Sequence, residues 1–267
     1  MPRSSAEAIV LRTRPVGESD LVVTFLTEAE GKLSGSAKNA RRSRRRFGGA
    51  LEPMTRGRAI WSETEGRELV RLESFEATAS FAARQADLAW FYLFAYLAEV
   101  ADTFAREKEP DPRFYRLVRA ATDASEKGKA PRTVRRWFET WTLRLQGLLP
   151  ELSACSRCGG TLQGLGLVVR AGSGEALCGA CAVRQAREPA SRGTTGLERG
   201  GSGSRSEGET VRLSAGEGEW IRRALAQPIS QVADPGPAAG IDRLVRLLFL
   251  EFTGKPFRSA RFLEVGR

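Results

Sequence analysis

The chain has 267 residues, 41% hydrophobic and 28% charged, and this composition excludes a wholly disordered protein. It carries 42 Lys and Arg against 32 Asp and Glu, which gives a net charge of +10 and a pI near 10.1. So large a basic excess favours a polyanionic partner, most often nucleic acid and less often an anionic membrane surface. The alternative is a basic protein without such a partner.

The first residues lack a signal-peptide core, because Arg12 and Arg14 interrupt the first apolar stretch. The most apolar stretch runs from Leu88 to Ala98, between Asp87 and Glu99, and its 11 uncharged residues are too few to span a bilayer. We therefore expect a cytoplasmic protein that does not bind membranes. Cytosolic thiols stay reduced, so paired cysteines there hold metals more often than they form disulfides.

The pattern of residues 1–80 predicts five short antiparallel strands. Branched and aromatic residues suit a pleated surface, and Gly31 allows the positive φ that a hairpin turn needs. Such strands fit a small closed barrel such as an OB-fold, although an SH3-like barrel gives much the same pattern. The strands are expected at Ala8–Arg14, Asp20–Thr27, Lys32–Ala40, Arg56–Glu63 and Glu68–Glu76.

After residue 80 the hydrophobic period changes to that of helices. Helices are predicted at Phe81–Phe104, at Phe114–Ser125 and from Arg132 to about Leu148, where Gly147 and Pro150 close the last one. Residues 81–151 would be the first part of an α-helical domain.

Two further segments follow. Residues 152–184 carry the cysteines, and residues 185–210 are rich in Gly, Ser and Thr and are expected to form a flexible linker. Helices are expected again at Ala215–Ala226 and Ile241–Thr253, in a C-terminal part of the helical domain at 211–267. The expected fold is therefore α+β and multidomain: a five-stranded barrel, OB-fold or SH3-like, then a helical domain with an inserted zinc finger.

The four cysteines form two Cys-x2-Cys pairs separated by 19 residues. Each pair lets two thiolates approach one ion from a tight turn, and two such turns complete a tetrahedron. The alternative is a pair of redox dithiols or inert buried thiols. Four thiolates leave no open coordination position, and the chain has no histidine, so the ion would be structural. We predict one Zn²⁺ bound by Cys155, Cys158, Cys178 and Cys181.

Positive charge clusters between the third and fourth predicted strands. From Lys32 to Arg58 there are nine Lys and Arg but only one acidic residue, Glu52. Arginine suits phosphate through its bidentate fork, and an OB-fold loop can embrace a nucleic-acid strand. The alternative is a solvated loop without a specific role. The predicted DNA-binding residues are Lys38, Arg41, Arg42, Arg44, Arg45, Arg46, Arg56 and Arg58.

No catalytic constellation is visible. The absence of histidine excludes Ser-His-Asp and Cys-His chemistry, and no phosphate-binding glycine motif is present. The acidic residues are dispersed, which argues against a Mg²⁺-dependent nuclease. We predict a binding protein and not an enzyme.

Several segments form a recognisable set in their order along the chain. They are Gly17–Leu21, Thr27–Lys32, the basic loop, Phe47–Pro53, Tyr96–Val100, Phe138–Pro150 with Cys155–Gly159, and Arg258–Leu263. This ordered set resembles the RecO family of DNA repair proteins and covers almost the whole chain apart from the linker. The resemblance implies an OB-fold, a helical domain and a zinc finger.

This resemblance implies a nucleoid-associated mediator of recombination in the RecF pathway, monomeric when alone. Such a protein binds single- and double-stranded DNA, anneals complementary strands, and works with RecR to help RecA replace single-strand-binding protein. The family engages the acidic C-terminal tail of single-strand-binding protein through its helical domain. Here Lys255, Phe257, Arg258 and Arg261 offer a suitable basic and apolar mixture. The competing hypotheses are a zinc-finger nuclease and an RNA-binding assembly factor built on an OB-fold.

Overall fold

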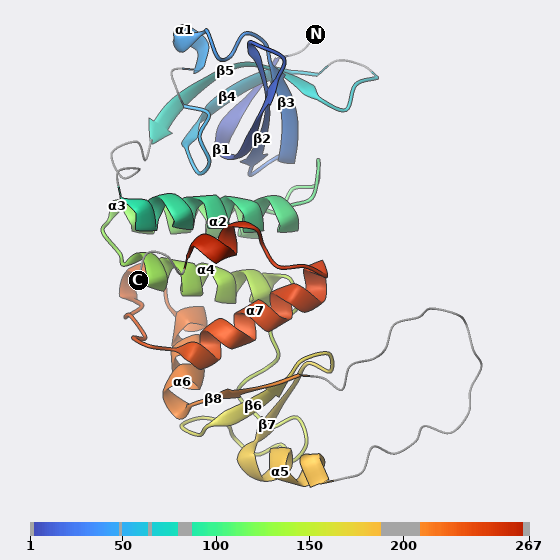
Figure 1. Ribbon diagram of the computed structural model, residues 1–267, viewed down its shortest axis with the longest axis vertical. Helices are drawn as coiled ribbons and strands as arrows, with labels where there is room; N and C mark the ends of the chain where they lie inside the picture. Colours follow the sequence, from blue (N-terminus) through green and yellow to red (C-terminus); the bar gives the residue numbers. More distant parts are fainter. Residues whose placement is uncertain (1–2, 48–49, 64–65, 80–86, 188–208, 264–267) are drawn as a thin grey trace, which may run out of the picture. The chain divides into compact units, whose positions relative to one another are not determined.

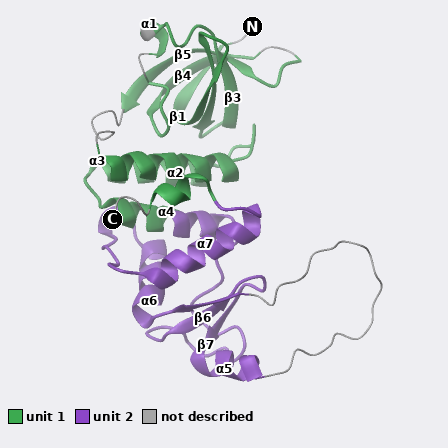
Figure 2. Cartoon of the chain, viewed as in Figure 1, with its two compact units in different colours: residues 1–138, 257–267 green, residues 139–256 purple. Residues whose placement is uncertain are grey.

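The computed structural model describes residues 3–47, 50–63, 66–79, 87–187 and 209–263. It divides into two compact units, the first formed by residues 1–138 with 257–267 and the second by residues 139–256 (Figures 1 and 2). The N-terminal strands and the first helices therefore share one unit. The expected linker lies almost entirely outside the described residues.

The first unit contains a closed five-stranded barrel in the order β1-β2-β3-β5-β4, in which β1 also pairs with β4. All its pairings are antiparallel except β3 with β5, which is parallel. This order and closure are those of an OB-fold, so the expected barrel is confirmed and the SH3-like alternative is not needed. The strands are β1 Arg3–Val16, β2 Asp20–Thr27, β3 Gly31–Ala37, β4 Arg56–Ser62 and β5 Val70–Ala79.

One long strand closes the barrel. The first half of β1 pairs with β4 and its second half with β2, and the β2 register shifts between Val10 and Arg12. A bulge of this kind bends a strand and increases its twist, which lets β1 belong to both sides of the barrel. The prediction placed the strand at Ala8–Arg14 and so missed both its ends.

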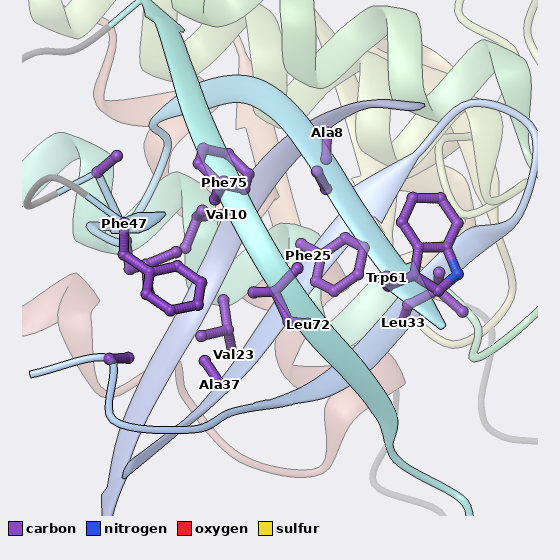
Figure 3. Packing of buried hydrophobic residues seen from close by; sticks show 14 of the residues in the cluster. Ala8, Val10, Val23, Phe25, Leu33, Ala37, Phe47, Trp61, Leu72 and Phe75 are labelled. Carbon is purple, nitrogen blue, oxygen red and sulfur yellow. The ribbon is translucent and has the colours of Figure 1, made fainter. Parts of the chain in front are cut away.

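The barrel is filled by alternate side chains of all five strands, which Figure 3 shows from close by. The short helix α1, Arg44–Phe47, adds the ring of Phe47, which is 2% exposed and belongs to the same cluster. The segment between β3 and β4 is therefore packed against the barrel by its apolar residues. Its neighbours in this cluster are Ala40, Ala50 and Leu51.

Two helices of the first unit, α2 Leu88–Phe104 and α3 Pro112–Glu126, are tied to the barrel. The Nζ of Lys32 on β3 donates to the backbone oxygen of Asp102 at 2.6 Å, and the lysine side chain is only 12% exposed. The turn before β3 is equally close: a Cβ on Gly31 would lie 2.2 Å from the carbonyl oxygen of Glu109. Glycine is therefore required at position 31 for close approach as well as for its φ of 69°.

The C-terminal segment returns to α2. The carboxylate of Glu99 accepts hydrogen bonds from the backbone N–H groups of Arg258 and Ser259, at 2.9 and 2.8 Å. The ring of Phe262 stacks on Tyr92, with centroids 5.3 Å apart. These contacts hold the short 3-10 helix η3, Ser259–Phe262, against α2.

The second unit combines helices with a small sheet. Its main helices are α6 Ala215–Ala226 and α7 Ala239–Thr253, and α4 Pro131–Leu145 enters it at Glu139. The sheet has the order β7-β6-β8 and consists of β6 Leu167–Arg170, β7 Glu175–Cys178 and β8 Thr210–Leu213, with α5 Gly179–Arg187 following β7. A 3-10 helix, η2 Ile229–Gln231, completes the described elements of this unit.

The predicted helices are present, with ends shifted by a few residues. The expected Phe81–Phe104 helix begins at Leu88, where the carboxylate of Asp87 accepts from the N–H of Ala89 and caps it; residues 80–86 lie outside the described part of the chain. The small sheet was not predicted, because its strands have only four residues each. No helix among the described residues is long and apolar enough to cross a membrane.

Candidate metal centre and nucleic-acid interface

The four cysteines come together as the sequence predicts. Their sulfur atoms all lie within 4.8 Å of one another, and those of Cys158 and Cys178 are 4.0 Å apart. Cys155 and Cys181 are buried, while Cys158 is exposed. Four sulfurs at this spacing fit the tetrahedral environment that Zn²⁺ prefers, with no ligand position left open.

Local backbone hydrogen bonds form the two turns that carry the cysteines. The N–H of Gly159 donates to the carbonyl of Cys155 at 2.9 Å, and the N–H of Cys155 donates to that of Gly160 at 2.8 Å. Gly159 has a φ of 71°, which favours glycine. The second pair stands where β7 passes into α5, so Cys178 ends the strand and Cys181 lies in the first turn of the helix.

The cysteine thiols differ in acidity because their surroundings differ. The pKa of Cys155 is lowered to about 6: burial, the largest single effect, acts against this, but backbone N–H groups, that of Cys178 first, donate to the sulfur. The pKa of Cys181 is raised to about 12, mainly by hydrogen bonding with Cys178 and then by burial. Four thiolates this close repel one another unless a cation compensates them, so metal binding here must displace protons. The donor set therefore fits a metal ion and favours its binding at higher pH.

The basic segment, residues 38–46, is held by the turn between β1 and β2. The backbone N–H of Arg41 donates to the carbonyl of Ser19 at 3.1 Å, and its guanidinium donates to the carbonyl of Glu18 at 3.2 Å. Both arginines that follow β3 most closely, Arg41 and Arg42, remain exposed. The β1–β2 turn and the basic segment thus form one continuous surface of the first unit.

Asp20 fixes the start of the basic segment. Its carboxylate accepts from the Nζ of Lys38 at 2.7 Å and from the backbone N–H of Asn39 at 2.8 Å. Asn39 has a φ of 54°, so this turn needs external support. The sequence pattern of Gly17–Leu21 predicts no role for Asp20, because the residues that Asp20 contacts are 18 and 19 positions away in the chain.

We expect Asp20→Asn to loosen the basic segment, because the amide cannot replace the charge-assisted bond to Lys38. Hydrogen exchange at the amides of Asn39 and Arg41 should accelerate, whereas Glu18→Gln, at an exposed carboxylate 4.0 Å from Arg42, should change it little. Lys38 first, and then the N–H of Asn39, lower the pKa of Asp20. The stabilisation is therefore present above the unfolded-state pKa and is lost as pH falls through the lower folded-state pKa. Equal exchange rates in both variants would contradict this role.

The remaining members of the predicted DNA-binding set have different surroundings. Arg45 is exposed, and Arg46 lies over the ring of Phe47, with 5.1 Å from its guanidinium carbon to the ring centroid. Arg44 belongs to α1, and its side chain lies outside the described atoms. Arg58 is exposed on β4, but in register it stands opposite Glu7 on β1 and Glu76 on β5. Two acidic residues are therefore its neighbours across the strands of the barrel.

Arg56 is engaged inside the first unit. Its side chain is 15% exposed and pairs with Asp123 at 2.7 Å and with Glu126 at 3.4 Å, both on α3. Its guanidinium is therefore neutralised by two carboxylates and joins the barrel to the helix. Arg56 stays a predicted DNA-binding residue, and these contacts show that its guanidinium already has two carboxylate partners within the first unit.

Replacing Arg56 with Met should lower the free energy of unfolding by about 1–2 kcal/mol, since two carboxylates lose their partner but remain partly solvated. DNA affinity should stay unchanged. Arg58→Met, on the same strand but exposed, should change stability by less than about 0.5 kcal/mol. The measurements are denaturant unfolding and DNA titration. Weaker DNA binding at unchanged stability for the Arg56 variant would show that it contacts DNA after all.

Comparison with known proteins covers both units. Residues 1–81 match the family model described as "Recombination protein O N terminal", and residues 85–239 match "Recombination protein O C terminal". A protein named "DNA repair protein RecO" from Anaeromyxobacter dehalogenans is 38% identical over 100% of this chain and 98% of its own length. Proteins of the same name from Koribacter versatilis and Myxococcus xanthus are 43% and 38% identical, over 58% and 70% of this chain and 63% and 76% of their own. The chain therefore belongs to the RecO family of DNA repair proteins.

Proposed function

We propose that this protein is a recombination mediator of the RecF pathway. It binds single- and double-stranded DNA, anneals complementary strands and, with RecR, helps to load RecA onto DNA coated by single-strand-binding protein. It acts by binding and not by catalysis, and it is monomeric when alone. The observation that carries this proposal is membership of the RecO family over both family segments, residues 1–81 and 85–239.

The proposed DNA contact is the basic segment on the barrel. Arg41, Arg42 and Arg45 are exposed, and the β1–β2 turn holds the segment. Guanidinium groups bind phosphate through paired donors, and phosphate contacts carry no sequence information. Binding is therefore sequence-independent and sensitive to salt. The residues assigned to it are Lys38, Arg41, Arg42, Arg44, Arg45 and Arg46.

The proposed metal is one Zn²⁺ at the four cysteines. The sulfur cluster supports this assignment, since thiolate ligands at tetrahedral spacing suit zinc. A site closed by four protein ligands leaves no position for water or substrate. The ion would stabilise the fold around β6, β7 and α5 and take no part in chemistry.

The proposed contact for the acidic tail of single-strand-binding protein uses the basic and apolar residues near the C-terminus, Lys255, Phe257, Arg258 and Arg261. Within the first unit, Phe257 packs edge-on against Tyr96 with centroids 5.9 Å apart. Arg258 and Arg261 are exposed, so their charges are available to carboxylates. Anchoring of this segment by Glu99 would present them in a fixed position.

The test is annealing of complementary strands precoated with the cognate single-strand-binding protein. We expect annealing of coated strands, and we expect Arg258→Glu with Arg261→Glu to abolish it while bare strands still anneal. Annealing of bare strands alone by the wild type would leave a general DNA-binding protein and refute the mediator role. Mg²⁺-dependent cleavage of bare DNA would support the nuclease hypothesis instead, and a clear preference for structured RNA would support the assembly factor.

A further inference from the structure

A groove of about 470 Å³ lies on the small sheet of the second unit, in the region of the metal centre. Residues of α5, β6 and β8 line it, including Val183 and Arg187 of α5, Val168 of β6 and Arg212 of β8. It is separate in sequence from both the basic segment and the C-terminal residues assigned above.

The sheet register explains how the groove is formed. Val168 on β6 pairs with Leu177 on β7 and with Arg212 on β8, so the three side chains share one face of the sheet. Leu177 is 2% exposed and α5 contacts both β7 and β6, so this helix covers the β7 side of the face. The part of this sheet face that lies over β8 is not covered by α5. Val168 forms part of the groove floor between α5 and β8.

The groove joins an apolar floor to a basic rim. Val183 is a large apolar residue that is 50% exposed, and Ala182 and Ala186 continue the apolar lining along α5. Arg187 on α5 and Arg212 on β8 are exposed. Among the residues that the structure describes, no acidic one lines the groove; Arg170 also lines it but has Glu175 opposite it in register. The net field in the groove is therefore positive, over a floor without charge.

This combination distinguishes between the polyanions that could enter. A nucleic-acid strand bound by its bases favours aromatic side chains for stacking, and none of the described residues that line the groove is aromatic. A strand bound by its phosphates gains nothing from an exposed valine. A peptide with an apolar side chain between carboxylates matches both the floor and the rim.

Two polar side chains of the lining support a peptide. The Oε1 atom of Gln185 and the Nε of Arg170 are buried and lack a hydrogen-bond partner among the described residues. A peptide backbone carries both N–H and C=O groups and can satisfy a donor and an acceptor once the side chains turn towards it. We propose that this groove binds an extended acidic segment of a partner protein, anchored by one apolar side chain at Val183. The proposal goes beyond the DNA-repair function above and does not depend on it.

The test uses the full-length, metal-loaded protein and a fluorescent ten-residue peptide with a central Leu between Asp residues. We expect saturable binding by the wild type, weakened on the order of tenfold by Arg187→Glu with Arg212→Glu, and several-fold by Val183→Ser. Arg187→Glu alone should also weaken binding several-fold, and Arg184→Glu is its matched control, because it makes the same charge change on an exposed residue of α5 that does not line the groove. The Arg184 variant should alter the affinity for the peptide by less than twofold.

Peptide variants separate the contributions. In the peptide, replacing Leu by Ser or Asp by Asn should weaken binding. Titration of the wild-type protein with the original peptide should shift the amide signals of Val168 and Val183. This measurement does not depend on the folding of any protein variant. Undetectable binding at millimolar peptide would overturn the proposal. Equal losses for the Arg184 variant would indicate general electrostatic attraction and overturn it too. A single-stranded oligonucleotide that displaces the peptide and is weakened by the same Arg187 and Arg212 changes would identify the groove as a nucleic-acid site instead.

Discussion

Replacing Cys155 and Cys181 with Ser should abolish metal binding and unfold the region around β6, β7 and α5. These two cysteines are the buried members of the cluster, and a hydroxyl is a much poorer zinc ligand than a thiolate. The metal-binding free energy of structural zinc sites is also folding free energy, about 10–16 kcal/mol in zinc-finger peptides. Losing this metal-binding free energy exceeds what the two four-residue strand pairings of the small sheet can supply.

The measurements are zinc content and hydrogen exchange. The wild type should carry about one zinc per chain, and the double variant none, with fast exchange at the β6 and β7 amides. Gln163→Ala, at an exposed residue between the two pairs, should retain both the metal and the protection. Full protection in the variant without metal would show that the sheet stands without the ion.

Acidity should release the same metal. The Cys181 thiol holds its proton most strongly, since its pKa is raised to about 12, and a metal must displace that proton to bind. Lowering the pH therefore weakens binding progressively, and zinc should leave before the barrel unfolds. A chelator at neutral pH should reproduce the exchange pattern of the double Cys variant.

Removing the exposed arginines of the basic segment should weaken DNA binding more than any of the other surface substitutions. In Arg41→Ala with Arg42→Ala and Arg45→Ala, three phosphate contacts disappear, so the slope of log K against log salt should become shallower by about 2–3. The affinity for DNA should fall by a larger factor at low salt than at high salt. The loss should be similar for DNA of different base sequences. The measurement is a titration of single- and double-stranded DNA across a range of salt concentrations.

A matched set of arginines controls for net charge. Arg113, Arg116 and Arg119 are exposed on α3 of the same unit, and their replacement with Ala removes the same total charge. This variant should leave the salt slope nearly unchanged. If both triple variants reduce it equally, DNA responds to the overall charge of the protein and the basic segment is not a defined interface.

The cysteine cluster and the barrel could be predicted from the sequence because their signals are local. Each cysteine pair forms within one tight turn, and the strands carry branched residues bounded by turns. The small sheet escaped prediction for the opposite reason. Its β8 strand follows a long Gly- and Ser-rich segment, yet it pairs with β6 some forty residues earlier. A four-residue strand has no periodicity that predicts so distant a partner.

The sequence by itself determined that nine basic residues cluster between Lys32 and Arg58, since the position of each charged residue along the chain is read directly from it. Only the tertiary structure decided what each charge does. Arg41 stays exposed, whereas Arg56 is only 15% exposed and pairs with Asp123 and Glu126, residues about seventy positions away. The physical reason is that an ion pair depends on distance in space, and folding brings carboxylates to one arginine of the cluster and leaves another to the solvent.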